Sequence, residues 1–507
     1  MLRADYLLAK AYFAVHLRPL PSIPDPSVCR PENRHIFKGK SFYAYTDCVN
    51  SYYLNINICR TKGTFILNSM YFLPRTATAP FCPSEVKGSI VIPPGLPFHK
   101  KLLRFAGPGL LVSVGYMDPG NWATDIEAGS RFGYGLLFVV LLASLAAMLL
   151  QTLCVRLGIV AQKDLAQACR AHYSPRVNRF LWLGAEIAII ACDLAEVLGS
   201  ALALHLLFGV SIPVGIAITA FDTLLVLGLQ GAGFRRVEAI VLGLVATIAG
   251  CFVVELAMSQ PNWLGVAMGF VPSFERLQQP GALYLAIGIV GATVMPHNLY
   301  LHSSIVQTRQ IAPTEAGRRQ AVRFATFDTL ASLSLALAVN AAIMILAASA
   351  FHGNGYREVA DIADAHRLLE PIVGSALAAG LFAFALLASG QSSTFTGTIA
   401  GQIIMDGFIN LKIPCWQRRV ITRGLALGPA FLGVWWFGDG GIGKMLVLSQ
   451  VVLSFQLPFA IWPLIRFTSS RTLMGTFANG PLLKLVAWSL FSVISGANVW
   501  LISSVVF

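Results

Sequence analysis

Eleven long apolar runs follow one another along the chain after about residue 98, and they constrain its fold more than any other feature. Each run is long enough to cross the roughly 30 Å hydrocarbon core of a bilayer as a helix. The runs lie at 105–129, 134–157, 179–206, 211–230, 238–258, 282–306, 325–350, 372–398, 417–437, 443–466 and 482–505. The chain is 56% hydrophobic and only 12% charged, which excludes an ordinary soluble domain. We therefore expect an all-α membrane protein with 11 transmembrane helices.

The distribution of lysine and arginine predicts how these helices are oriented. Basic residues gather before the first run and after the second, fourth, sixth, eighth and tenth runs, while the alternate loops carry few of them. Under the positive-inside rule, this pattern places the N-terminus in the cytoplasm and the C-terminus outside. The net charge of +13 then reflects membrane topology. We expect a multi-pass protein of the cell (inner) membrane, with the lipid bilayer as its partner, no nucleic acid and no obligate protein partner.

Residues 1–97 differ in composition from the rest of the chain. They are rich in Tyr, Asn, Pro and Cys and contain no long apolar run. We interpret them as a poorly ordered N-terminal tail or a mis-assigned start, and residues 98–507 as the transmembrane domain. The nine cysteines of the chain are scattered without a CxxC pair, so the sequence indicates neither a zinc site nor a disulfide framework.

A polar tetrapeptide, Asp118-Pro119-Gly120-Asn121, interrupts the first apolar run. A carboxylate in the middle of a membrane costs several kcal/mol, so Asp118 is a candidate functional residue. Pro119 removes a backbone donor and Gly120 loosens the helix, so we expect the helix to unwind here. Unwinding frees carbonyl oxygens such as that of Gly115. The alternative is a proline kink that holds a satisfied polar pair.

A second interruption, from Ala292 to His297, falls in the sixth run and again contains a proline, Pro296. Five spans separate the two breaks, as a 5+5 inverted repeat requires, and the eleventh helix is then an addition to that repeat. Two broken helices at corresponding positions of two halves indicate a binding site near the middle of the membrane. The pattern therefore predicts a transporter with helices 1 and 6 broken.

The groups at the two breaks are candidate metal ligands. Asp118 offers a carboxylate and Asn121 an amide oxygen, while Gly115 and Ala292 offer backbone carbonyls. Oxygen ligands alone suit magnesium and calcium, whereas a thioether such as that of Met295 shifts the preference toward manganese, iron, cobalt and cadmium. Methionine is also a flexible core filler, which is the alternative interpretation of this residue.

Intramembrane glutamines form a further group of candidates. Gln450 lies near the middle of the tenth run, and we interpret it as a sixth metal ligand that completes the shell when the site closes. Glutamine within a membrane often only joins helices by hydrogen bonds, and for Gln391 in the eighth run this is the interpretation we prefer.

Three carboxylates in the third run, those of Glu186, Asp193 and Glu196, are spaced so that they share one helical face. Carboxylates aligned within a membrane are typical of a proton path. They need a cationic partner, for which Arg423 in the ninth run is the candidate; a structural ion-pair network is the alternative. Two histidines of the sixth run, His297 and His302, are candidates for continuing the path, and the alternative for His297 is a metal ligand.

The site patterns leave several classes of protein open. A sodium-coupled transporter of amino acids or other organic solutes would also use two broken helices but would not need Met295. A passive metal channel is disfavoured because intramembrane carboxylates with an arginine partner favour coupled transport. A membrane-embedded metalloenzyme is disfavoured because the sequence lacks HExxH, a histidine-rich cluster and a nucleophile with a base. We therefore do not expect an enzyme.

The pair of motifs Asp118-Pro119-Gly120-Asn121 and Met295-Pro296-His297 resembles the signature of the Nramp family of proton-coupled divalent metal transporters. The resemblance covers about residue 98 to the end and is closest to the compact bacterial manganese transporters of this family. It implies a LeuT-like fold and proton-coupled import of Mn²⁺ or Fe²⁺, with Cd²⁺ and Co²⁺ as further substrates, and no cofactor. It also implies that magnesium and aluminium specialists, which would lack the methionine, are not the right comparison.

The resemblance assigns roles to residues by position. The metal ligands would be Asp118, Asn121, the Ala292 carbonyl and Met295, joined in some states by the Gly115 carbonyl and Gln450. The proton pathway would include His297, Asp193, Glu196 and Arg423, together with Glu186. The N-terminal tail departs from the compact bacterial pattern.

Overall fold

The computed structural model describes residues 47–51, 56–61, 64–67, 87–92, 95–221, 234–409 and 415–506. The chain divides into two compact units, residues 1–72 and 73–507. In the first unit, β1 (Asp47–Ser51), β2 (Ile56–Thr61) and β3 (Thr64–Leu67) form an antiparallel sheet in the order β1-β2-β3. Most of the predicted tail of residues 1–97 lies outside the described residues, so its interpretation stays a prediction.

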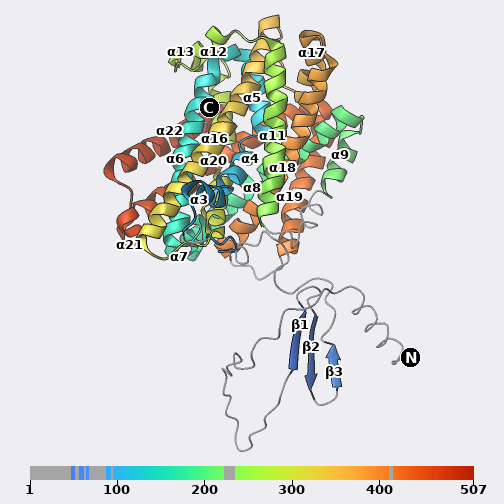
Figure 1. Ribbon diagram of the computed structural model, residues 1–507. Helices are drawn as coiled ribbons and strands as arrows, with labels where there is room; N and C mark the ends of the chain where they lie inside the picture. Colours follow the sequence, from blue (N-terminus) through green and yellow to red (C-terminus); the bar gives the residue numbers. More distant parts are fainter. Residues whose placement is uncertain are drawn as a thin grey trace, which may run out of the picture. The chain divides into compact units, whose positions relative to one another are not determined.

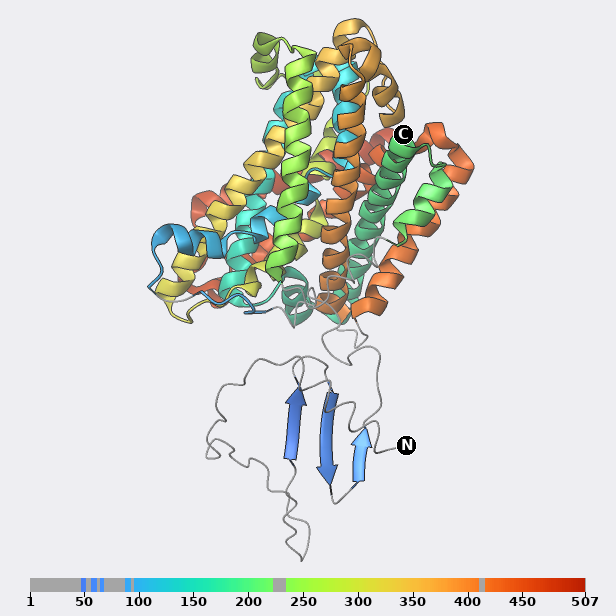
Figure 2. The same ribbon diagram turned by 45° about the vertical axis from the view of Figure 1, so that its right-hand side comes forward.

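The second unit is built of helices (Figures 1 and 2). The long helices are α6 (Leu137–Ala161), α8 (Pro175–Phe208), α11 (Phe234–Ser259), α16 (Glu315–Ala350), α18 (Ala376–Ile409), α19 (Cys415–Phe437), α20 (Ile442–Ser469) and α22 (Pro481–Val506). The short ones outside the two breaks are α3 (Phe98–Phe105), α7 (Leu165–His172), α9 (Ile212–Thr219), α12 (Trp263–Gly269), α13 (Phe274–Leu277), α17 (Ile362–Val373) and α21 (Arg471–Met474). Single 3₁₀ turns, such as η2 (Gly133–Leu136) and η3 (Val306–Thr308), connect several of them.

Each of the 11 predicted runs contains a described helix, although only α9 of the fourth run is described. Within the described residues, eight helical segments are long and apolar enough to cross a membrane. The second half of the first span is continuous with the second span, and neither α9, which has eight residues, nor α19 is among the eight segments. The prediction of an all-α membrane protein is confirmed.

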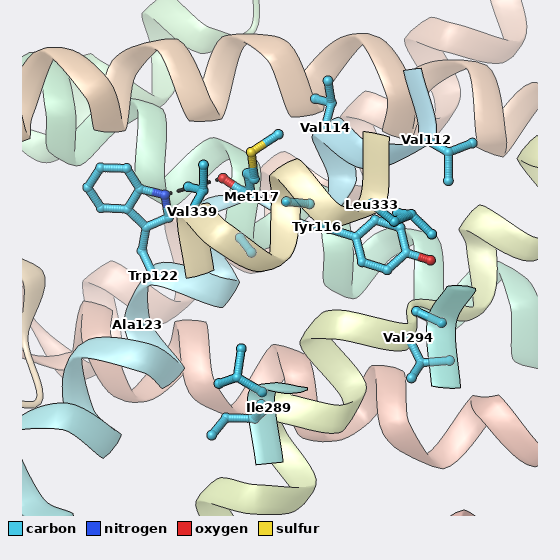
Figure 3. Packing of buried hydrophobic residues seen from close by; sticks show 14 of the residues in the cluster. Val112, Val114, Tyr116, Met117, Trp122, Ala123, Ile289, Val294, Leu333 and Val339 are labelled. Atoms are coloured by element: carbon cyan, nitrogen blue, oxygen red, sulfur yellow. Dashed lines mark hydrogen bonds between the residues drawn. The ribbon is translucent and has the colours of Figure 1, made fainter. Parts of the chain in front are cut away.

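The first span is broken where the sequence predicts it. Helix α4 (Pro108–Gly115) ends before Asp118, and α5 (Pro119–Phe132) begins at Pro119. Proline is favoured at the first position of a helix, where its missing N–H is not needed. The carbonyl of Met117 between the two helices accepts hydrogen bonds from the Trp122 indole at 3.2 Å, seen in Figure 3, and from the Ser389 hydroxyl at 2.5 Å. Hydrogen bonds from α5 and from α18 therefore both hold the backbone at the break.

The sixth span is broken at a single residue. Helix α14 (Ala282–Val294) ends at Val294 and α15 (Pro296–Ile305) begins at Pro296, with Met295 between them. Met295 has a φ of 39°, in the left-handed region that non-glycine residues rarely adopt. Such a conformation persists only when the surrounding structure holds it, and it is typical of functional sites.

Helices α8 and α18, from the predicted third and eighth spans, pack along each other more extensively than any other pair of described helices. Small residues allow this approach and also bring α8 against the first break. A Cβ atom at Gly199 of α8 would overlap the ring of Pro119, and one at Gly390 of α18 would overlap the Ser200 hydroxyl. Helices α8 and α18 therefore form a scaffold beside the broken helix.

Figure 1 shows α3, α7 and α21 at one end of the helical unit and α12, α13 and α17 at the opposite end. The first three helices carry basic residues of the loops assigned to the cytoplasm: Lys100, Lys101, Arg170 and Arg471. This separation is the one that the orientation prediction requires. Which end faces the cytoplasm stays a prediction.

Candidate functional site

Asp118 is the N-cap residue of α5, and only one of its two carboxylate oxygens has a hydrogen-bond donor. It is fully buried, and its Oδ1 accepts hydrogen bonds from the backbone N–H of Asn121 at 2.8 Å and from the Asn121 amide at 2.7 Å. Among the described residues, its Oδ2 has no hydrogen-bond partner. A buried carboxylate oxygen without a donor is costly, so this oxygen is available for a cation.

The thioether of Met295 lies in the other break and is also fully buried. Its Sδ accepts a hydrogen bond at 3.4 Å from the amide of Asn298, three residues further along α15. Asn298 also approaches the first broken helix, because a Cβ atom at Gly115 would lie 2.5 Å from its Nδ2. The sulfur is thus oriented by an amide that contacts both broken helices.

The two breaks meet through the side chain of Asn121. Its Nδ2 donates to Asp118 Oδ1 and, at 3.0 Å, to the carbonyl of Ala292 near the end of α14. Its Oδ1 accepts a hydrogen bond at 3.3 Å from Asn340 of α16. The amide nitrogen therefore bridges two acceptors from the two broken helices. Three predicted ligands come together in this way, and Asn340 is an additional contact that the sequence reasoning missed.

Gln450 of α20 lies against the first break. A Cβ atom at Gly120 would overlap its Nε2, so Gly120 provides the space that this side chain occupies. Gln450 donates a hydrogen bond to Ser449 at 2.9 Å, and its Oε1 has no hydrogen-bond partner within the described residues. Its backbone carbonyl approaches Gly291 of α14. Gln450 is thus close to both breaks, while its role as a ligand, like that of the Gly115 carbonyl, stays a prediction.

The acidic residues of α8 face two other helices. Asp193 and Glu196 both approach Gly397 of α18, where a Cβ atom would lie 2.9 Å from Asp193 Oδ1 and 2.6 Å from Glu196 Oε1. Arg423 of α19 lies with its Nη1 3.7 Å from Glu196 Oε2 and donates to the Thr219 carbonyl at 3.4 Å. Glu186, also buried, lies two turns earlier on α8. The structure therefore pairs this acidic face with the arginine that the sequence proposed.

A cysteine that the sequence reasoning missed lies between the second break and these acids. Cys192 Sγ lies 3.5 Å from His297 Nε2, two residues after Met295, and 3.6 Å from Glu196 Oε1. Cys192 is 2% exposed. The only sequence signal for it is its spacing, one turn before Glu196 on the same helix. The thiol is thus the hydrogen-bonding group between the broken helix α15 and the acidic face of α8.

If the site carries metal ions together with protons, as the resemblance of the motifs implies, replacing Cys192 by alanine is expected to lower the number of protons that enter per metal ion by about tenfold, because it removes the group between His297 and Glu196. Metal uptake itself should change little, and Cys192→Ser should behave like wild type because a hydroxyl also donates and accepts. Lumenal pH and metal entry would be followed together in proteoliposomes. The control is Cys251→Ala, a buried cysteine of α11. Equal proton-to-metal ratios in Cys192→Ala and wild type would exclude the link.

His302 belongs to a different group of contacts. Its Nδ1 lies 2.9 Å from Gln151 Oε1 of α6, and the Gln151 amide donates at 2.9 Å to the hydroxyl of Tyr116 beside the first break. The structure therefore places His302 with Gln151 and Tyr116, beside the end of α4, whereas His297 lies with the acids of α8. A part for His302 in proton movement stays a prediction.

A charged network that the sequence reasoning also missed holds the start of α4. Asp328 of α16 accepts hydrogen bonds from the backbone N–H groups of Gly107, at 3.2 Å, and Gly109, at 2.7 Å. Arg309, whose side chain is 1% exposed, pairs with Glu238 of α11 at 2.7 Å and donates to the Ala106 carbonyl at 2.6 Å. We name these residues, Ala106, Gly107, Glu238, Arg309 and Asp328, the inner lock.

The inner lock is tight because its charges are buried together. Burial lowers the pKa of the Arg309 guanidinium, and Glu238 beside it opposes that shift. Gly107 has a φ of 132°, and a Cβ atom there would overlap Glu238. Arg235 adds a second ion pair to Glu238 at 3.0 Å and donates to carbonyls at the end of α3. Moving the start of α4 away from α16 requires the hydrogen bonds from Gly107 and Gly109 to Asp328 to break.

Comparisons with known proteins match most of the chain. Residues 109–504 match the family described as "Natural resistance-associated macrophage protein-like". The chain is 68% identical over 430 residues to the divalent metal cation transporter MntH of Ralstonia nicotianae, which covers 85% of this chain and 97% of that protein. It is also similar to a crystal structure of the Eremococcus coleocola manganese transporter, at 40% identity and a TM-score of 0.77, covering 83% and 90% of the two chains.

A more distant likeness bears on the fold alone. The structure of Mhp1, a nucleobase-cation-symport-1 family transporter, matches with a TM-score of 0.54 at 14% identity, covering 85% of this chain and 96% of that one. Mhp1 has the arrangement of helices known from LeuT. The prediction of a LeuT-like fold is therefore confirmed.

Proposed function

The chain belongs to the Nramp family, and we propose that it imports Mn²⁺ and Fe²⁺ across the cell membrane together with protons, by alternating access. It is a multi-pass membrane protein that transports divalent metal cations, and it is not an enzyme. The relatives are named for divalent metal cations and manganese. Iron, cadmium and cobalt as further substrates, the coupling to protons and the direction of transport belong to the proposal.

The observation that carries the proposal is the position of the Asn121 amide between the two broken helices. Its nitrogen bridges Asp118 Oδ1 and the Ala292 carbonyl, two acceptors that a cation would also bridge. Rotating the amide by 180° would present its oxygen to the same space and its nitrogen to Asn340, whose Oδ1 lacks a partner within the described residues. Asp118 Oδ2 would then complete a set of oxygen ligands around the metal ion.

The sulfur of Met295 supports a transition metal over an alkaline-earth ion. Calcium and magnesium prefer oxygen ligands, whereas a thioether favours manganese, iron and softer ions. Met295 is held in place by its strained backbone and by the hydrogen bond from Asn298. The sulfur therefore need not be ordered again when a metal binds, which lowers the free energy that binding requires.

Replacing Met295 by alanine is expected to lower Mn²⁺ uptake about tenfold and to allow Ca²⁺ to compete, because only oxygen ligands would remain. Radioactive Mn²⁺ uptake into proteoliposomes would be measured with and without a large excess of Ca²⁺. The control is Met344→Ala, which removes a fully buried methionine from α16. If excess Ca²⁺ still fails to inhibit Mn²⁺ uptake by Met295→Ala, the thioether does not set the selectivity between the two ions.

The acidic face of α8 supports coupling to protons. Asp193, Glu196 and Glu186 are buried in a membrane-spanning helix, and Arg423 lies beside Glu196. Three carboxylates buried near a single arginine cannot all stay charged in an apolar interior at low cost. Binding a proton removes the charge that the arginine does not balance. The path is separate from the proposed metal ligands, and through Cys192 it ends at His297, two residues after Met295. A proton can thus pass inward without sharing the cation's position on Asp118.

The inner lock supports alternating access. Helix α4 is short, and the inner lock fixes its first residues to α11 and α16. Release of that lock would let α4 swing away while α8 and α18 stay in place, opening the site at the end where α3, α7 and α21 lie (Figure 1). We propose that this end faces the cytoplasm, with the N-terminus inside and the C-terminus outside.

A further inference from the structure

A hollow of about 830 Å³ lies where α20 connects to α22, away from the metal site. It is lined by two basic side chains, Arg471 and Lys484, and by Thr476, Asn479 and the backbone of the glycines Gly475 and Gly480. We name it the basic hollow. It lies at the first turn of the 26-residue helix α22, which begins at Pro481.

The walls of the basic hollow are fixed by hydrogen bonds to the helical core. Arg156 of α6 donates to the Asn479 side chain at 3.1 Å and also to the carbonyl of Phe477. Asn479 donates to the Thr468 hydroxyl at 2.8 Å, and its backbone N–H donates to the Thr468 carbonyl at 2.9 Å. A loop held in this way presents its cations in a nearly constant position, which favours binding of a specific ligand.

The two cations of the basic hollow are not neutralised by the protein. In the part of the chain that the structure describes, neither Arg471 nor Lys484 makes an ion pair or a side-chain hydrogen bond. Glu315 contacts the loop through Thr476 at 3.1 Å, but it is paired with Arg319 at 2.9 Å. The basic hollow therefore has an excess of positive charge and would attract an anion.

The surface beside the basic hollow is apolar and faces the membrane. Leu482 and Leu485 of α22 are 73% and 66% exposed, on either side of Lys484 in the sequence. Only 22% of the apolar stretch of α22 is buried within the protein, so most of this helix faces lipid. A charged hollow next to such a surface matches a molecule with an anionic head and an apolar chain.

The position along the bundle identifies the side of the membrane. Helix α21, which begins with Arg471, lies at the same end as α3 and α7 in Figure 1. That end carries the basic loops assigned to the cytoplasm, where anionic phospholipids are attracted to lysine and arginine. We propose that the basic hollow binds the phosphate headgroup of an anionic phospholipid of the cytoplasmic leaflet, with its acyl chains over Leu482 and Leu485.

The test uses the full purified chain and native mass spectrometry. Equal amounts of phosphatidylglycerol and phosphatidylethanolamine are added, and the retained lipid is identified. Wild type should retain phosphatidylglycerol preferentially, and Arg471→Gln with Lys484→Gln should weaken that binding about thirtyfold, since each charge near a lipid headgroup contributes about 1 kcal/mol. The matched control is Arg176→Gln with Arg179→Gln, two exposed arginines at the start of α8.

Three results would overturn the proposal: equal retention of the two lipids, unchanged binding in the double variant, or displacement of the lipid by millimolar inorganic phosphate, which would indicate a site for a free anion. The charge-preserving swap Arg471→Lys with Lys484→Arg guards against misfolding and should bind as wild type does. Lipid retention is measured without any metal. Its outcome is therefore independent of whether the protein transports Mn²⁺.

Discussion

Replacing Asp118 by asparagine is expected to reduce Mn²⁺ uptake by at least about a hundredfold, because it removes the charge of the proposed ligand, whose Oδ2 has no donor among the described residues. Asparagine is a good N-cap, so α5 should still begin at Pro119. The loss of uptake would then report on the missing charge and not on a damaged helix. Uptake of radioactive Mn²⁺ into proteoliposomes measures the effect.

The control for this experiment lies on the same helix. Asp125 is also buried and lies seven residues after Asp118, about two turns along α5. Asp125→Asn should retain most of the uptake, since Asp125 is not one of the groups that meet at the two breaks. If Asp118→Asn still transports Mn²⁺ at a rate near wild type, Asp118 is not a required ligand and the proposed site is wrong.

Replacing Arg309 by alanine is expected to open the protein toward the cytoplasm and to lower Mn²⁺ uptake at least about tenfold. Removing one member of a buried ion pair costs about 3–5 kcal/mol, which is enough to shift a balanced two-state equilibrium by a hundredfold or more. Glu238 would keep only Arg235, and the Ala106 carbonyl would lose a donor. The closed inner end would become the minor state.

Accessibility of a buried position measures this shift. Val112 lies on α4, three residues before its end, is 0% exposed and is labelled in Figure 3. A Val112→Cys protein should react with a membrane-impermeant maleimide from the inner side about tenfold faster when Arg309→Ala is added. The control is Arg323→Ala, an exposed arginine of α16. If labelling is unchanged after Arg309→Ala, the inner lock does not keep this end of the protein closed.

The sequence predicts the broken helices well because proline and ionisable residues are rare in apolar spans and cannot be hidden there. Asp118 and Pro119 locate the first break, and Pro296 locates the second to within one residue. The sequence also predicts the pairing of Glu196 with Arg423, because buried charges require partners. Each of these features follows from the free-energy cost of placing a proline or a charged side chain in an apolar helix.

Other parts of the site could not be predicted, because they depend on which helices pack together. Asn340 stands alone among the apolar residues around it in α16, and a buried cysteine such as Cys192 is usually a small core residue. The inner lock joins α4, α11, η3 and α16, whose contacts no local pattern reveals. Gly120 was expected to loosen the helix, yet the structure also shows it as the space for Gln450.

The alternatives that the sequence left open are narrowed by the comparisons and the geometry together. An organic-solute transporter of the same overall fold would have no use for a thioether held at the second break, and the matched relatives are metal transporters. A passive channel would not need the acids of α8 or the inner lock. The coupled metal transport that we propose would use all of these groups.

The most direct measurement follows Mn²⁺ and protons at the same time. The purified protein is placed in liposomes with an acidic outside and a pH-sensitive dye inside, and Mn²⁺ entry is recorded together with lumenal pH. Coupled transport predicts that adding Mn²⁺ accelerates acidification and that entry increases as the outside becomes more acidic. Mn²⁺ entry without acidification would contradict proton coupling, and absence of Mn²⁺ entry would contradict the metal site itself.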